Sequence, residues 1–116
     1  KLNFIMLNAY PYNPGHLMVV PYRHLDNLTR LTEEERNEHF ALVTRGIEVL
    51  KEAFNPAGYN IGANLGKVAG AGIDDHFHSH IVPRWQGDTN VIPVLADTRV
   101  IPQALKDTYK DLVKKF

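Results

Sequence analysis

The sequence predicts an α+β fold in which an antiparallel sheet carries two helices, because strand-like and helix-like patterns alternate along the chain. Short apolar runs bounded by proline, glycine or asparagine are typical of strands, and they occur in two pairs. Each pair is followed by a segment in which apolar residues recur every three or four positions. This order favours one sheet with helices on one face. Residues 1–116 are expected to form a single domain, since 44% hydrophobic residues can supply one core.

The first strands are predicted at Phe4–Leu7 and Leu17–Val20. Two prolines and a glycine lie between Tyr10 and Gly15 and mark the connection as a turn. Because the chain starts directly in a strand pattern at Leu2, the sequence leaves open that a segment precedes it in a longer natural protein.

The first helix is predicted to follow Thr32, because its hydroxyl and the carboxylate of Glu35 have the spacing of a capping box. The helix should end before Asn55 and Pro56, since proline cannot continue it. His39 lies on this helix without an evident partner. The expected buried stripe consists of residues spaced three or four apart: Phe40, Val43, Ile47, Leu50 and Phe54.

The second half of the chain predicts three further strands, at 59–64, 77–82 and 91–95. Three glycines between Gly66 and Gly72 form a loop where the backbone can approach a ligand closely. A closing helix is expected from Pro102, with an apolar stripe formed by Leu105, Tyr109, Leu112 and Phe116.

Composition limits the classes of partner and location. Thirteen basic and thirteen acidic residues balance, so no overall field attracts nucleic acid or an anionic membrane, and an anion must be captured locally. The absence of cysteine excludes a disulfide framework, a cysteine nucleophile and thiolate zinc sites. No apolar run reaches about 18 residues and no signal-peptide pattern opens the chain, which predicts a cytoplasmic protein.

Three of the six histidines alternate along one predicted strand, at His76, His78 and His80. Side chains of a strand alternate between its faces, so these three imidazoles should share a face at intervals of about 6.6 Å. The residues between them should face the other way: Phe77, Ser79 and Ile81.

Three histidines on one face of an apolar strand are unusual as core filling. One functional reading is a zinc or copper site, for which further ligands would come from Asp74, Asp75, His16 or His24. His24 is otherwise expected to be structural or at the surface. The favoured reading is nucleophilic catalysis, in which a neutral imidazole attacks phosphorus and neighbouring groups hold the phosphate oxygens.

Other residues near this strand are of the kinds that bind phosphate. His16 follows a tight turn, Arg84 follows the histidines, and amides of Gly70 and Gly72 could reach the start of the strand. Each of these signals is weak alone, because a single arginine is usually a solvated surface charge.

Side chains alternate between the two faces of a strand, so Met6 and Asn8 should share one face of the first strand. His16 and Met18 should likewise share one face of the second strand. A polar pair beside two soft apolar side chains would suit a ribose and a base. The alternative is that both methionines are ordinary core residues.

With these motifs, the chain resembles the histidine triad proteins. The run His76–Val82 fits their signature, with Ser79 as a polar occupant of a normally apolar position. The resemblance also covers Asn8, Pro14–Val19, Pro21–His24, Asn64 with Gly66, and Pro83–Arg84. It implies a compact α+β domain, usually a homodimer that joins two sheets, and reaction through a nucleotidyl-histidine intermediate.

The resemblance implies that His78 is the nucleophile and that His76 and His80 orient it and bind phosphate. His16 would support the same phosphate. Further expected contacts to substrate are Asn8 to the ribose, Met6 and Met18 to the base, and Asn64 to phosphate or groups beside the nucleophile.

One segment departs from the family pattern. Many members carry Gln-Ser/Thr-Val shortly before the triad, where this chain has Gly70-Ala71-Gly72-Ile73. Either the glycine amides replace the usual hydroxyl contact to the leaving group, or the leaving group or acceptor differs.

Residues 8–16 and 82–90 look most like the branch of diadenosine tetraphosphate phosphorylases and fragile histidine triad hydrolases. We therefore expect transfer of a nucleoside monophosphoryl group from a dinucleoside polyphosphate to phosphate or water. No protein-bound metal is required, although Mg²⁺ could accompany the polyphosphate. The alternatives are a nucleotide-binding sensor without turnover and a nucleoside phosphoramidase.

Overall fold

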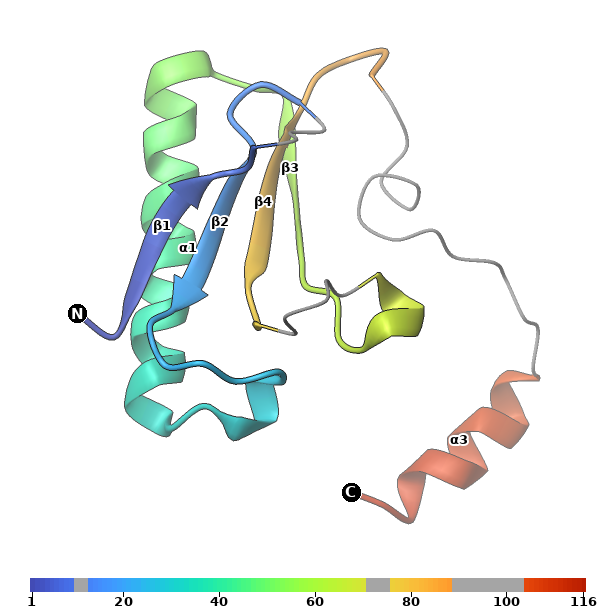
Figure 1. Cartoon of the computed structure of the whole chain (residues 1–116). Coiled ribbons are helices and arrows are strands. Elements are labelled where there is room, and N and C mark those ends of the chain that lie inside the picture. The colour runs from blue at the N-terminus through green and yellow to red at the C-terminus, as the bar shows by residue number, and fades with distance from the viewer. Residues whose placement is uncertain (10–12, 71–75, 89–103) are drawn as a thin grey trace.

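The computed structural model describes residues 1–9, 13–70, 76–88 and 104–116, and the predicted strand at 91–95, Pro102, Asp74, Asp75 and Gly72 lie outside these ranges. Four strands form one antiparallel sheet in the order β1-β2-β4-β3 (Figure 1). The predicted α+β class is confirmed. The elements are β1 (Asn3–Leu7), β2 (Leu17–Pro21), η1 (Leu28–Arg30), α1 (Glu33–Phe54), β3 (Gly58–Gly62), η2 (Lys67–Ala69), β4 (Ser79–Arg84) and α3 (Leu105–Val113).

The predicted hairpin of β1 and β2 is confirmed, and it continues into β4. Met6 pairs with Met18 across the first two strands, and Met18 pairs with His80 across β2 and β4. Directly opposed residues on an antiparallel sheet project from the same face. Met6, Met18 and His80 therefore form a row across three strands.

Helix α1 begins and ends where the sequence predicts. The Thr32 hydroxyl accepts a hydrogen bond from the Glu35 amide at 3.1 Å, and the Thr32 amide donates to the Glu35 carboxylate at 2.8 Å. The helix ends at Asn55, whose left-handed backbone (φ 47°) is a common helix C-cap conformation. These local contacts satisfy amides and carbonyls that the helix leaves unpaired.

The buried face of α1 differs from the predicted stripe. Phe40 and Phe54 are 69% and 53% exposed, whereas the buried positions are Glu35, His39, Val43, Gly46 and Leu50. Gly46 lies where α1 packs closely on β4, because a Cβ atom there would lie only 2.7 Å from Cδ1 of Ile81. Phe40 and Phe54 lie outside the buried stripe, whereas Val43 and Leu50 belong to both the predicted and the observed stripe.

The core lies between α1 and the sheet. Val19 and Ile81 are fully buried and pack with Val43 and Leu50 of the helix. A second cluster of Leu25, Leu31 and Phe77 lies beside it. Ile81 and Phe77 therefore face the interior, as alternation predicts, and α1 covers one face of the sheet.

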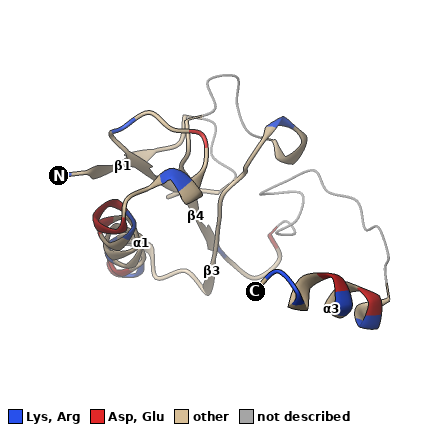
Figure 2. Ribbon diagram, turned by 90° about the horizontal axis from the view of Figure 1, so that it is seen from below, with Lys and Arg blue, Asp and Glu red and all other residues tan. Residues whose placement is uncertain are grey.

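The closing helix α3 forms near its predicted place, and its apolar side chains are exposed: Leu105, Tyr109, Leu112 and Val113. Strand β3 is shorter than predicted and covers Gly58–Gly62. Figure 2 shows residues of both charge signs on the two helix ribbons and little charge on the strands, in keeping with the balanced composition. In the described part of the chain, no helix has the length and apolar character needed to cross a membrane.

Candidate active site

The histidine strand begins later than predicted. Strand β4 starts at Ser79, so His76 and His78 precede it. The reason is that the chain before Ser79 makes other hydrogen bonds: the Phe77 amide donates to the Leu25 carbonyl at 2.7 Å. Of the three histidines, only His80 lies in the sheet. The prediction that all three imidazoles project at regular intervals from one strand is therefore wrong for His76 and His78.

Two of the three histidines nevertheless meet, together with His16. The rings of His78 and His80 have centroids 4.8 Å apart in an edge-to-face arrangement. Nε2 of His16 lies 2.8 Å from Nδ1 of His80, a hydrogen bond between buried side chains. The structure thus joins the end of the β1–β2 connection to the start of β4.

Asn8 and Met18 lie beside this cluster. The Asn8 side-chain nitrogen is 3.5 Å from His16 Nε2 and 3.7 Å from the Met18 sulfur. Met6, which pairs with Met18, is 44% exposed. The predicted group of polar and soft apolar side chains therefore forms next to His16 and His80.

The position of His16 depends on the turn that precedes it. The Asn13 carbonyl accepts a hydrogen bond from the His16 amide at 3.2 Å. Gly15 has φ +81°, and a Cβ atom there would lie 3.0 Å from Leu50 and Phe54 side chains. Only glycine adopts this backbone easily, so Gly15 lets the connection pass closely over α1.

Burial keeps His16 and His80 neutral near neutral pH. Desolvation, followed by the nearby charges of His78 and His16, lowers the pKa of His80 to about 4. Desolvation and then His78 also lower the pKa of His16. Neutral imidazoles can each donate one hydrogen bond and accept one, which suits a site that must handle both protons and phosphate oxygens.

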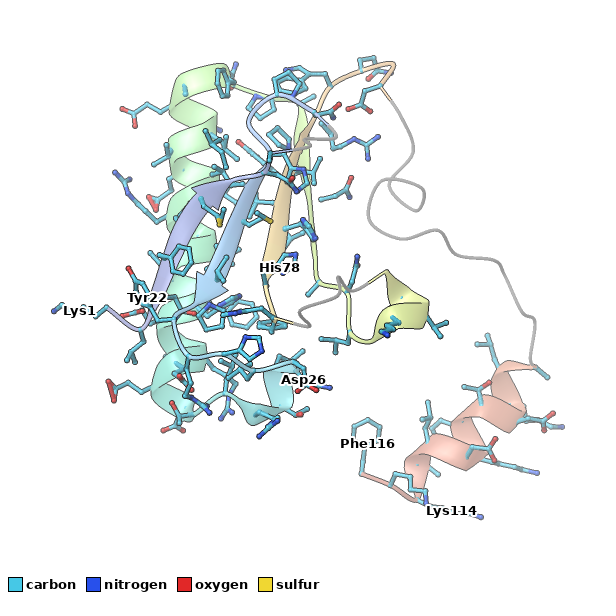
Figure 3. The ribbon with its side chains drawn as sticks, in the orientation of Figure 1. Lys1, Tyr22, Asp26, His78, Lys114 and Phe116 are labelled. Atoms are coloured by element: carbon cyan, nitrogen blue, oxygen red, sulfur yellow. The ribbon has the colours of Figure 1, made fainter. Side chains whose placement is uncertain are left out.

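His78 is oriented by the backbone just before it, and Figure 3 labels it beside β4. Its Nδ1 lies 2.9 Å from the His76 carbonyl oxygen. A carbonyl oxygen only accepts, so Nδ1 carries the hydrogen, and in the neutral ring Nε2 keeps its lone pair. This tautomer presents Nε2 as a nucleophile.

His76 turns away from this cluster toward His24. Its Nε2 donates to the Pro21 carbonyl at 2.8 Å, and its Nδ1 lies 3.0 Å from Nδ1 of His24. The side chain of His76 therefore anchors the backbone whose carbonyl holds His78. From the sequence, His24 was expected to be a structural or surface residue, with a metal ligand as the alternative, and this hydrogen-bonded pair was not predicted.

Asn64 and Gly70 lie together in the glycine-rich segment around η2. A Cβ atom on Gly70, which has φ +94°, would lie 3.2 Å from the Asn64 side-chain nitrogen. No hydrogen bond joins Asn64 to the triad histidines within the described residues. Gly72, the other predicted amide donor, lies outside them.

Arg84, at the far end of β4, is hydrogen-bonded to other side chains of the protein. Its Nε donates to the Asp88 carboxylate at 2.9 Å, and a second nitrogen donates to the Asn60 side-chain oxygen. The Asp88 carboxylate also accepts from the Asn13 side chain at 2.8 Å, and its pKa is lowered first by the Trp85 amide and then by Arg84. Arg84 thus ties the turn after β4 to the β1–β2 connection. Sequence reasoning missed Asp88 and Asn60 as the partners of Arg84, and Asn13 as a further partner of Asp88.

The alternative hypothesis of a zinc or copper site requires a cluster of metal ligands. In the parts of the chain that the structure describes, no group of three or more histidine, aspartate or glutamate side chains could hold a metal ion. The close histidine nitrogens at 2.8 and 3.0 Å are instead at hydrogen-bond distance.

Comparisons with known proteins identify the family of this chain. The family model described as HIT domain matches residues 1–87. A protein of Mycobacterium tuberculosis named AP-4-A phosphorylase is 47% identical over 116 residues, which is 100% of this chain and 60% of that protein. The Schizosaccharomyces pombe bis(5'-nucleosyl)-tetraphosphatase [asymmetrical] is 35% identical over 88 residues, 76% of this chain and 48% of that protein.

Solved structures show the same fold. The structure of a HIT family protein from Bacillus anthracis superposes with a TM-score of 0.76 at 23% identity, covering 99% of this chain and 79% of that one. The chain spans less than two thirds of the length of the two enzymes named above.

Proposed function

The chain belongs to the HIT domain family, and on that premise we propose that it transfers a nucleoside monophosphoryl group from a dinucleoside polyphosphate to inorganic phosphate. The relative that supports the substrate and the acceptor is the one named AP-4-A phosphorylase, which aligns with the whole chain. The observation that carries the chemistry is the hydrogen bond from His78 Nδ1 to the His76 carbonyl at 2.9 Å.

The reaction proceeds in two displacements. Nε2 of His78 attacks the α-phosphorus, a nitrogen–phosphorus bond forms, and the bond to the bridging oxygen breaks to release a nucleoside polyphosphate. An oxygen of phosphate then attacks the same phosphorus, and the bond to His78 breaks. The product is a nucleoside diphosphate, and two easier steps replace one difficult displacement.

The side chains around His78 support these steps. Because His16 Nε2 and His80 Nδ1 are hydrogen-bonded to each other and both rings are neutral, one of the two rings has an N–H left to donate to a phosphate oxygen and the other offers a lone pair. Asn8 is near enough to His16 to contact the ribose of the same nucleotide, and Met6 and Met18 offer apolar surface to its base.

The structure bears differently on the other residues that were predicted to contact the substrate. Asn64 and Gly72 stay candidates for the leaving phosphates. The Gly70 amide already donates to the Lys67 carbonyl at 3.0 Å, which argues against the predicted contact of this amide with phosphate. The contacts of Arg84 with Asp88 and Asn60 favour a supporting role for this residue over direct binding of phosphate.

Hydrolysis is the second candidate, because the Schizosaccharomyces pombe relative is named as a tetraphosphatase. Both reactions share the nucleotidyl-His78 intermediate and differ only in whether phosphate or water attacks it. The polyphosphate can carry Mg²⁺ as its counter-ion, and the proposal assigns no metal to the protein.

Product analysis with diadenosine tetraphosphate tests the function. With millimolar phosphate we expect ADP and ATP, and without phosphate we expect little turnover. AMP and ATP formed at the same rate under both conditions would instead establish the hydrolase. Binding without turnover would favour the nucleotide sensor, and cleavage of a nucleoside phosphoramidate alone would favour the phosphoramidase.

We infer that the protein is a homodimer formed along the open edge of β3. Among the described residues β3 pairs only with β4, so its other edge is open. Phe40 and Ile61 line an apolar cavity of about 190 Å³ and are 69% and 47% exposed. Light scattering of the purified protein should give twice the mass of one chain, and Ile61→Lys should reduce it to one. A wild-type monomer would contradict the dimer.

The cytoplasmic location stays a prediction from composition. Cell fractionation followed by immunodetection would test it.

A further inference from the structure

Three polar side chains, two of them buried and one half-buried, form a hydrogen-bonded chain behind the histidine cluster. Asn3 of β1 and His39 of α1 are 3% and 4% exposed, and Ser79 opens β4. Nδ1 of His39 lies 2.9 Å from the Asn3 side-chain oxygen, and Nε2 of His39 lies 2.7 Å from the Ser79 hydroxyl. The chain crosses from one edge of the sheet, through the helix, to the strand that carries His80.

The direction of each hydrogen bond follows from the acceptors around Asn3. The Asn3 side-chain nitrogen donates to the Glu35 carbonyl at 3.2 Å and to the Glu38 carboxylate at 3.1 Å. Both of these groups only accept, so the Asn3 oxygen must face His39 and accept from its Nδ1. The neutral ring then has a lone pair on Nε2, and the Ser79 hydroxyl donates to it.

The protonation state of His39 agrees with this assignment, because burial lowers the pKa of the ring. Every polar atom on the path from Asn3 to Ser79 has a partner of the correct kind. A fully satisfied buried network of this type fixes one arrangement of the elements that it joins.

Ser79 occupies the one position where this arrangement can reach the nucleophile. It is the residue between His78 and His80, and the β2–β4 ladder ends there, at the pair Val19 and Ser79. The irregular backbone that carries His78 immediately precedes Ser79. An anchor on the Ser79 side chain therefore fixes the point from which that backbone departs.

We propose that Asn3, His39 and Ser79 are positioning residues that hold the start of β4 so that Nε2 of His78 is aimed at the α-phosphorus. This inference rests on the proposed function, because the group being aimed is the nucleophile of that reaction. The three residues act through His78 and do not touch the substrate.

The test compares Ser79→Ala with Ser79→Thr in single-turnover formation of the nucleotidyl-His78 intermediate. Loss of the anchor should slow this step by about 10-fold to 100-fold with little change in KM, since small misplacements of reacting groups cost rates of that order. Ser79→Thr keeps a hydroxyl and should restore most of the rate.

Two controls separate positioning from general destabilisation. Ile47→Ala removes a partly buried side chain from the same helix, away from Ser79, and should lower stability while leaving the rate nearly unchanged. The double variant of Asn3→Ala and Ser79→Ala should be no slower than Ser79→Ala alone, because both break the same chain.

Nitrogen-15 NMR of the histidines gives a readout that needs no turnover. In the wild type, His78 should be the Nδ1–H tautomer, and in Ser79→Ala the signal should shift toward a mixture of tautomers. An unchanged His78 signal together with an unchanged rate in Ser79→Ala would overturn the inference. If the wild type forms no intermediate but the tautomer shift occurs, the proposed function fails and the positioning role stands.

Ser79→Cys is the second variant if Ser79→Ala does not fold. It keeps the size of the side chain but donates only weakly, so it should show the same slow step. A wild-type rate in this folded variant would also overturn the inference.

Discussion

Replacing His78 by alanine is expected to lower the rate of nucleotidyl transfer by at least about 1,000-fold, because the variant has no atom that can bond to phosphorus. The Nε2 lone pair that the His76 carbonyl preserves is removed with the ring. Steady-state assays with diadenosine tetraphosphate measure the loss. Circular dichroism should show a folded variant, since the His78 side chain lies outside the buried core clusters.

Acid-quenched mass spectrometry supplies the independent check. The wild type should carry one added nucleoside monophosphate after brief exposure to substrate, and His78→Ala should carry none. Arg45→Ala, on an exposed position of α1, should behave as the wild type. An adduct that persists in His78→Ala would assign the nucleophile to another residue.

Acidification is expected to destabilise the folded protein between about pH 6.5 and pH 4. The pKa of His80 falls from 6.5 to about 4 on folding, first because of burial and then because of His78 and His16. Over this interval the unfolded chain binds a proton that the folded chain does not, so unfolding becomes easier as the pH falls. For His80, which is 7% exposed, the shift corresponds to roughly 3 kcal/mol, present above pH 6.5 and lost by about pH 4.

His16 and His39 act in the same direction, because burial also lowers their pKa values. The carboxylates act at lower pH. Arg23 is the largest cause that lowers the pKa of Glu35 to about 2, so the contribution of Glu35 is lost only below its ordinary value of 4.5. The histidines therefore dominate the first part of the acid response.

Urea unfolding at about pH 7 and pH 4.5 measures this first part. The free energy of unfolding should fall clearly between the two conditions in the wild type. His80→Asn, which cannot take up a proton, should show a smaller fall. Equal stability of the wild type at both pH values would contradict neutral burial of these histidines.

Local features were predictable because neighbouring residues determine them. The capping box of Thr32 and Glu35 and the end of α1 at Asn55 need no information from distant residues. The β1–β2 hairpin likewise follows from its two apolar runs and the turn residues between them. The grouping of His16 with the triad was inferred from the family resemblance, and the structure confirms that His16 meets His80.

Features that depend on long-range packing were not predictable. The periodicity of α1 allows two adjacent stripes, and only the packing of the helix on the sheet shows that the stripe with Gly46 is buried and that Phe40 is exposed. The partner of His39 lies 40 residues away at Ser79, and its only signal was a polar residue in a normally apolar position. Arg84 has the charge of a phosphate ligand, but its actual partner, Asp88, depends on the turn after β4.

The sequence by itself therefore determined the α+β class, the hairpin, the capped helix and the alternating histidine motif. Periodicity, turn residues and capping act within a few residues, so they can be read in order along the chain. Only the tertiary structure decided which face of α1 is buried, that His76 turns to His24, and that His78 presents Nε2. These choices depend on hydrogen bonds and close contacts between elements, whose geometry exists only after the elements pack together.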